Sequence, residues 1–210
     1  MSLIHPEVLD KKRQDIFSKI KIFKDNGYLA GGTALSLQIK HRYSFDFDIF
    51  LGRKIKRADY LLLKQYFGVR KIILDAPDQL TVISEKNIKI TLLFYPYRNL
   101  FPFLKTKSLP LLSLKDIAAD KVFTIGRRGA WRDYFDLFFL LQGGYVSLLE
   151  IIKLAKRKFK KEFNEKLFLE QLVYFRDLGE FKIALIGGQY TEDKVKKYLI
   201  KEVKTMKIVD

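Results

Sequence analysis

The sequence contains no cysteine, only two histidines (His5 and His41) and five prolines in 210 residues. The lack of cysteine excludes disulfide bonds and thiolate-bound metals, and two histidines so far apart do not predict a zinc site. The first six residues lack the apolar run of a signal peptide, and no apolar stretch is long enough to span a bilayer. We therefore expect a cytoplasmic protein that has no membrane partner.

Positive charge is what the sequence has in excess. Lysine and arginine number 40 against 24 acidic residues, which gives a formal net charge of +16. Such an excess commonly reflects a polyanionic partner, because these side chains neutralise phosphates and release counterions. A lysine-rich proteome or a neutralising partner protein would give the same balance, but we favour nucleic acid. A hydrophobic content of 48% predicts a globular protein rather than a disordered one.

The hydrophobic pattern changes along the chain from mixed to helical. Apolar, β-branched runs predict strands at 28–30, 44–51, 70–74, 80–84 and 88–94. Helical spacing predicts helices at 7–26, 33–39, 56–67, 114–125, 131–141, 148–161, 165–175 and 192–201. Three of the five prolines lie between 95 and 110, and we interpret this segment as a connector between two halves of the chain.

A glycine pair follows the first predicted strand. Gly31 and Gly32 have no Cβ, so backbone N–H groups there can approach a ligand closely. Thr33 is a plausible N-cap for the next helix, whose N-terminus would favour a phosphate group. A glycine pair alone is more often only a turn, and its meaning depends on what stands nearby.

Two aspartates stand nearby, on the next strand. Asp46 and Asp48 are two residues apart, so their side chains point to the same face. The flanking apolar residues are expected to be buried, and two like charges in such surroundings are costly unless compensated. These residues are Phe45, Phe47, Ile49 and Phe50. A divalent cation compensates both charges, and carboxylate oxygens suit magnesium or manganese.

Four segments of the chain, taken in order, match a known pattern. They are GGTAL at 31–35 with HRYSFDFDIF at 41–50, YPY at 95–97, SLKDIAADK at 113–121, and RRGAWRDYFDL at 127–137. Together they resemble the AbiEii/AbiGii toxin family of nucleotidyltransferases, within the DNA polymerase β-like superfamily. The resemblance implies an α+β fold: a mixed sheet flanked by helices, followed by a helical bundle. It implies a catalytic α/β core at 1–105 and, at 106–210, a helical region that completes the active site.

The resemblance also implies a nucleotide site. Asp46 and Asp48 would be catalytic and would hold Mg²⁺ or Mn²⁺, which bridges the triphosphate of an NTP substrate. Lys121 would place a positive charge on the nucleotide phosphates, although a lysine on such a helix is by default exposed. We take the neighbouring Asp120 as exposed. The residues that would contact the nucleotide on the glycine side are Gly31, Gly32, Thr33 and Arg42.

The last motif groups two arginines and two aspartates. If this segment is helical, the three-residue spacing puts Asp133 and Asp136 on one face. One aspartate could complete the metal site or act as general base, or all four residues could form a structural Arg–Asp network. We favour a catalytic role for Asp136 and an ion pair for Asp133, and we assign Arg128, Arg132 and Asp133 to the nucleotide-binding side.

One position departs from the superfamily pattern. On the strand over 87–93, Thr91 stands where a third carboxylate is expected, and threonine is a poor magnesium ligand. Either Asp136 substitutes, or the acceptor needs no general base, or the protein binds nucleotide without efficient transfer.

A basic run follows in the helical half, on a predicted helix with an apolar side. Such a helix can lie on RNA or on a membrane surface, although it is more often a solvated face. We take it as the first surface to test for RNA. Its members are Lys153, Lys156, Arg157, Lys158, Lys160 and Lys161.

The leading hypothesis is a magnesium-dependent nucleotidyltransferase that moves a nucleotide from NTP to an RNA acceptor such as tRNA. As the toxin of a toxin–antitoxin or abortive-infection system, it would be restrained by a cognate antitoxin protein. A kinase-like phosphotransferase acting on a protein and a catalytically defective nucleotide- or RNA-binding module stay open as alternatives.

Overall fold

The computed structural model describes residues 4–206, which form two compact units. The first unit contains the residues up to Pro96 together with Pro102–Leu112. The second contains Tyr97–Phe101 and the residues from Ser113 on, so the chain passes between the units more than once. The division into functional domains at 105/106 stays a prediction.

A five-stranded mixed sheet is the centre of the first unit. Its order is β1-β2-β5-β4-β3, in which β2 and β5 pair parallel and all other neighbours pair antiparallel. The strands are β1 (Gly27–Ala30), β2 (Phe47–Leu51), β3 (Lys71–Asp75), β4 (Gln79–Ile83) and β5 (Lys89–Phe94). The predicted α+β fold with a mixed sheet is confirmed. The strand predicted over 44–51 begins only at Phe47, so Asp46 lies just before it.

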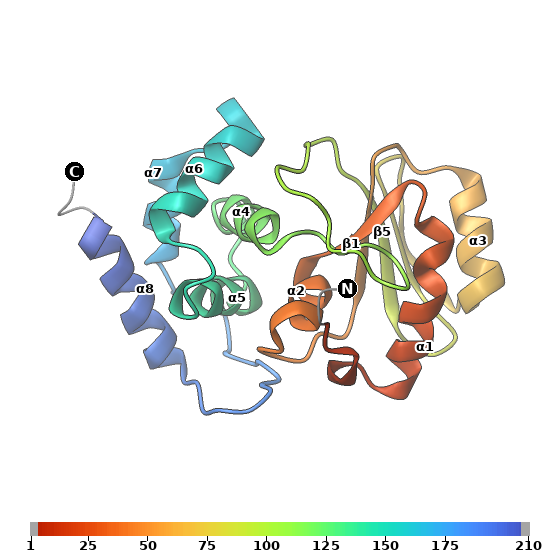
Figure 1. The fold of residues 1–210 in the computed structure, drawn as a ribbon, viewed down its shortest axis with the longest axis horizontal. Helices are drawn as coiled ribbons and strands as arrows, with labels where there is room; N and C mark the ends of the chain where they lie inside the picture. Colours follow the sequence, from red (N-terminus) through yellow and green to blue (C-terminus); the bar gives the residue numbers. More distant parts are fainter. Residues whose placement is uncertain (1–3, 207–210) are drawn as a thin grey trace. The chain divides into compact units, whose positions relative to one another are not determined.

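Helices flank this sheet. In Figure 1, α2 lies to the left of the sheet and α3 to its right. The prediction of one helix over 7–26 is wrong. The structure divides this segment into short helices, and the middle one has an N-cap of its own. Asp10 caps the middle one by accepting a hydrogen bond from the Arg13 amide at 2.9 Å. The helical elements of the unit are η1 (Pro6–Val8), α1 (Lys11–Lys19), η2 (Ile20–Phe23), α2 (Gly31–Ile39) and α3 (Arg57–Phe67).

Alternation along β2 decides which residues enter the core. Phe47, Ile49 and Leu51 are fully buried, whereas Asp48 and Phe50 on the opposite face are partly exposed. This alternation is what the period of two predicts for a strand with one apolar face. The expected burial of Phe45 is wrong, since 47% of its surface is exposed, and Phe50 is only partly buried. Phe45 lies before the strand, outside the sheet.

The second unit is helical, as predicted. Helix α4 packs against α5, α6 and α7, and α8 packs against the same three helices. The bounds are α4 (Leu114–Ile125), α5 (Trp131–Gln142), α6 (Leu148–Phe159), η3 (Lys160–Glu162), α7 (Glu165–Leu172) and α8 (Glu192–Met206). Ser113 is the N-cap of α4, as predicted, and accepts a hydrogen bond from the Asp116 amide at 3.0 Å. Helix α7 ends earlier and α8 ends later than the pattern indicated.

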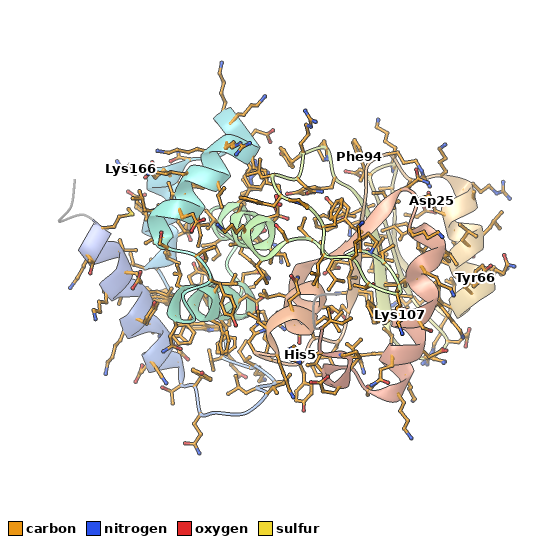
Figure 2. All side chains as sticks on the ribbon, in the orientation of Figure 1. His5, Asp25, Tyr66, Phe94, Lys107 and Lys166 are labelled. Atoms are coloured by element: carbon orange, nitrogen blue, oxygen red, sulfur yellow. The ribbon has the colours of Figure 1, made fainter. Side chains whose placement is uncertain are left out.

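Aromatic side chains fill the core of this unit. Trp131 stacks on Phe175 with ring centroids 5.9 Å apart, and Tyr134 donates a hydrogen bond to the Gln171 carbonyl at 2.6 Å. Burial raises the pKa of Tyr134 well above its ordinary range. Over residues 4–206, no helix is both long and apolar enough to cross a membrane. Basic side chains occur on both units, as the labelled Lys107 and Lys166 illustrate in Figure 2.

Candidate active site

The turn between β1 and α2 brings the helix N-terminus against the aspartate strand. Ala30 is the register partner of Asp48, and Gly31 begins α2 with a φ of +66°. A Cβ on Gly31 would lie 2.7 Å from the Asp48 Oδ2 atom, so the Asp48 carboxylate would have to move to admit a side chain there. Glycine is therefore needed here twice, for its backbone angle and for the close approach of the Asp48 carboxylate.

Thr33 has a different role from the predicted one. The N-cap of α2 is Ala30, so Thr33 lies inside the helix and its N-cap assignment is wrong. Its buried hydroxyl donates a hydrogen bond to the Asp46 carbonyl and lies 2.9 Å from the Ser44 hydroxyl. Thr33 thus ties the segment before β2 to α2 and fixes the backbone at Asp46.

Arg42 lies against the first turn of α2. A Cβ on Gly32 would be 2.5 Å from Nη2 of Arg42, so the glycine leaves room for the guanidinium. The arginine is 4% exposed, and its Nη1 atom donates a hydrogen bond to the Tyr43 carbonyl at 3.0 Å. Its carbonyl in turn accepts a hydrogen bond from the Ser36 hydroxyl at 2.5 Å. A fixed positive group therefore lies beside the N-terminus of α2, where both attract anions.

The neighbouring strand β5 contributes a threonine and a lysine to the same face. Thr91 is the register partner of Asp48, so it occupies the position where a third carboxylate was expected. Lys89 stands two residues earlier and therefore on the same face, and its Nζ atom lies 2.6 Å from Oδ2 of Asp46. Sequence reasoning missed Lys89, although its spacing from Thr91 could have indicated a shared face.

The carboxylate oxygens at this end of the sheet are of the kind that a hard divalent cation takes as ligands. Asp46 and Asp48 offer carboxylate oxygens, and Gly31 keeps the space beside Asp48 free of a side chain. Within the described residues, no group of three or more histidine, cysteine, aspartate or glutamate side chains could hold a metal. A cation here would complete its coordination with water or with substrate oxygens, as Mg²⁺ commonly does.

The second unit contains the other predicted cluster. Lys121 on α4 lies with its Nζ atom 2.7 Å from Oδ1 of Asp133 and 2.6 Å from Oδ2 of Asp136, both on α5. The predicted shared face of the two aspartates is thus present. Lys121 is 8% exposed and Asp136 is fully buried, so the default expectation of a surface lysine is wrong. Arg128 and Arg132 are exposed.

A second buried ion pair in this unit was not expected. The Lys158 Nζ atom lies 2.6 Å from Oδ1 of Asp120 and 3.1 Å from Oδ1 of Asp116, and its side chain has no exposed surface. Placing Lys158 on the basic surface is therefore wrong. The expected exposure of Asp120 is wrong as well, since its side chain is 18% exposed.

Comparison with solved structures identifies proteins that share this fold. MenT4, a nucleotidyltransferase toxin of Mycobacterium tuberculosis H37Rv, is similar with a TM-score of 0.62 at 14% identity, over 95% of this chain and 83% of that one. JHP933 of Helicobacter pylori is similar with a TM-score of 0.56 at 15% identity, over 98% and 96% of the two chains. At such identities the likeness shows a shared fold alone.

Comparison with sequences gives the family. Residues 84–196, more than half of the chain, match the family described as nucleotidyl transferase AbiEii toxin, type IV toxin–antitoxin system. An uncharacterized protein of Aquifex aeolicus (strain VF5), aq_aa25, is 32% identical over 186 residues, which cover 82% of this chain and 87% of that one. The chain belongs to the AbiEii family of nucleotidyltransferases, which confirms the resemblance. The matched stretch includes Lys121, Asp133 and Asp136, whereas Asp46 and Asp48 precede it.

Proposed function

We propose that this chain is the toxin of a toxin–antitoxin pair and moves a nucleotide from a magnesium- or manganese-bound NTP to an RNA acceptor such as tRNA. The observation that carries the proposal is the close approach of Asp48 to Gly31 at the N-terminus of α2, 2.7 Å from the position of a Cβ. It combines a metal-binding carboxylate with a helix end that attracts phosphate.

In this proposal the first unit binds the triphosphate. Gly31 and Gly32 present backbone N–H groups, and the guanidinium of Arg42 adds charge beside them. Asp46 and Asp48 would hold the metal ion, which when bound neutralises charge that develops on the reacting phosphate. Thr33 acts through Asp46, because its hydroxyl fixes the backbone of that residue. Thr33 is therefore a positioning residue, and the group that would bind the substrate is its backbone N–H.

Lys121 and Asp136 are proposed as catalytic residues of the second unit. Lys121 supplies a positive charge for the phosphates, and Asp136 takes the proton of the acceptor hydroxyl. The ion pairs to Asp133 and Asp136 hold Lys121 in one position, at 2.7 and 2.6 Å. Because two carboxylates share one ammonium group, Asp133 can keep Lys121 oriented while Asp136 accepts a proton. Arg128 and Arg132, exposed on the same unit, are proposed to contact the nucleotide.

The net charge of +16 supports a nucleic acid as the acceptor. Lys153, Lys156, Arg157 and Lys160 are exposed and stay candidates for the RNA surface, together with Lys161. We further propose that a cognate antitoxin limits the activity in the cell and that the protein works in the cytoplasm.

The test is transfer of an α-phosphate label from each of the four NTPs to total tRNA with Mg²⁺ or Mn²⁺. Wild-type protein should label the tRNA, and a chelator should abolish the label until metal is restored. Asp48→Asn should lower the rate by about 100-fold or more, because a misplaced or missing metal ligand removes both positioning and charge stabilisation.

Asp78→Asn is the matched control for this test. Asp78 is an exposed carboxylate in the same unit, in the turn before β4, and its replacement should leave transfer unchanged. Absence of label with every NTP, or equal rates for Asp48→Asn and the wild type, would refute the proposal.

A further inference from the structure

A stack of flat groups runs from the core of the second unit to its surface. Phe159 on α6 is 2% exposed and stacks on Phe123 of α4, with ring centroids 3.8 Å apart and an interplanar angle of 5°. Arg127 follows α4, and its Cζ atom also lies 3.8 Å from the centroid of the Phe123 ring. Two groups so close to one centroid lie on opposite faces of the ring. The outermost member of the stack is therefore an arginine, whose side chain is 54% exposed.

Two further residues of the same unit hold this stack in place. The ring of Tyr97 meets both phenylalanine rings edge-on, at centroid distances of 5.6 and 4.9 Å. Its hydroxyl donates a hydrogen bond to Oε2 of Glu162 at 2.6 Å, and the same oxygen lies 3.4 Å from Nη2 of Arg127. The guanidinium is thus oriented before any ligand binds, which lowers the entropic cost of binding to its exposed face.

The surroundings of Arg127 favour stacking over the binding of a phosphate. Glu162 is 55% exposed and places a negative charge beside the guanidinium, so a phosphate there would meet a carboxylate. A nucleobase has no net charge, and the planes of arginine side chains stack on the unpaired bases of RNA. Exposed cationic side chains adjoin both residues in the chain, and these can contact the phosphates of a strand. They are Arg128, Lys160 and Lys161.

We propose that Arg127 is a stacking platform for an unpaired base of the acceptor RNA. The inference rests on the proposed function, because it states where the acceptor of that reaction binds. The base of an NTP has the same stacking chemistry, but the adjoining cations suit the several phosphates of a strand. Tyr97 is a positioning residue that acts through Glu162. The last residue of YPY and the first of RRGAWRDYFDL, which the proposed reaction leaves without a role, thereby act together.

The experiment measures binding of the full-length chain to two labelled oligomers by fluorescence anisotropy. One is a single-stranded oligoadenylate, and the other has the same number of phosphates but lacks the bases. We expect the wild type to bind the oligoadenylate more tightly. Arg127→Lys keeps the charge and loses the flat face, so it should weaken oligoadenylate binding by about three- to fivefold. Binding of the abasic oligomer and the salt dependence of both affinities should stay unchanged.

Arg176→Lys is the matched control. Arg176 is an exposed arginine of the same unit, between α7 and α8, and its replacement should leave both affinities unchanged. Binding of magnesium-bound ATP alone, measured by calorimetry, identifies the source of the base. We expect the wild type and Arg127→Lys to bind this nucleotide equally well.

The possible results separate this inference from the proposed function. Equal affinity of the wild type for the two oligomers, or an equal loss for both in Arg127→Lys, would show that only charge is read and would overturn the inference. Weaker binding of magnesium-bound ATP by Arg127→Lys would assign the platform to the donor and overturn it too. Each of these results would leave nucleotidyl transfer standing, whereas absence of α-label transfer by the wild type would refute the proposed function itself.

Discussion

At the scale of single residues, Lys158 shows that position on a helix, rather than polarity, can decide whether a side chain is buried. The residues of α6 that enter the core recur three or four positions apart, at Ile151, Ala155 and Lys158. Lys158 therefore falls on the buried stripe, where a lysine is stable only with partners. Asp116 and Asp120 on α4 supply them, at 3.1 and 2.6 Å.

We expect Lys158→Met to lower the free energy of unfolding by about 3–5 kcal/mol, because two carboxylates would stay behind without their cation. Lys153→Met, on the exposed side of the same helix, should change it by no more than about 0.5 kcal/mol. Urea unfolding followed by circular dichroism measures both. Equal stability of the two variants would contradict the structural role of the buried pair.

The chemical identity of the candidate residues could be predicted from the sequence, but their contacts could not. Asp46 and Asp48 were predicted as metal ligands from their spacing, their apolar neighbours and the family resemblance, and this stays a prediction. The hydroxyl of Thr33 reaches the Asp46 carbonyl, and Lys89 reaches the Asp46 carboxylate, across separate elements. Such contacts depend on how α2, β2 and β5 pack, and no local pattern contains that information.

At the scale of elements, the β1–α2 turn is a part of the fold that a single added methyl group would disturb. Gly31 combines a φ of +66° with a Cβ position 2.7 Å from Asp48 Oδ2. Gly52 follows β2, and a Cβ there would meet nothing within 4 Å. The two glycines therefore offer a comparison between a restricted and a tolerant position within one unit.

Gly31→Ala should lower the free energy of unfolding by about 1–2 kcal/mol through its backbone angle. It should also reduce nucleotidyl transfer by about 100-fold, because Asp48 must move away from the new methyl group. Gly52→Ala should leave both quantities close to the wild type. Thermal unfolding and the tRNA labelling assay measure the two effects, and a fully active Gly31→Ala protein would show that the position of Asp48 is not critical.

Most elements could be predicted because their hydrophobic period is regular, as in α4 and β4. The errors lie where a local signal competes with a distant contact. The segment 7–26 has helical spacing throughout, yet Asp10 starts a new helix in the middle of it. The alternation of aspartate with apolar residues extends back from β2 to Phe45. The pairing of β2 with β5 nevertheless begins only at Phe47, and its pairing with β1 begins at Asp48.

At the scale of the whole molecule, the path of the chain between the units was not predicted. The proline-containing segment was expected to be a simple connector. Instead, Pro102–Leu112 returns to the first unit, where the Leu29 amide donates to the Pro110 carbonyl at 2.8 Å and the Leu112 amide to the Leu29 carbonyl at 2.9 Å. Pairing of this kind links residues about eighty positions apart, and composition does not reveal it.

The acidic groups of the first unit predict a loss of stability in acid. Burial raises the pKa of Asp59, but hydrogen bonds from Arg53 and from the Lys56 amide outweigh it and hold the pKa below its ordinary value. A hydrogen bond from its own backbone amide and one from Lys40 lower the pKa of Glu7 to about 2. The unfolded chain binds protons more readily at these groups. Their contribution to the free energy of unfolding is therefore present above about pH 4 and is lost as the pH falls.

We therefore expect the free energy of unfolding to decrease between about pH 4.5 and pH 2, and to be nearly constant just above this range. Asp59→Asn should be less stable than the wild type at pH 6, and the difference should shrink at pH 3. Urea unfolding at the two pH values measures this. A difference that is equal or larger at pH 3 would contradict the assigned direction of the Asp59 pKa.

The central claim is that the chain transfers a nucleotide, rather than a phosphate, with metal held by Asp46 and Asp48. The most direct measurement compares NTP labelled at the α-phosphate with NTP labelled at the γ-phosphate, each incubated with the protein, Mg²⁺ and total tRNA. We expect the α-label, and not the γ-label, to appear on RNA, and Asp48→Asn to lower the rate of α-label transfer by about 100-fold or more. Appearance of the γ-label on RNA or on a protein, or α-label transfer by Asp48→Asn at the wild-type rate, would contradict this mechanism.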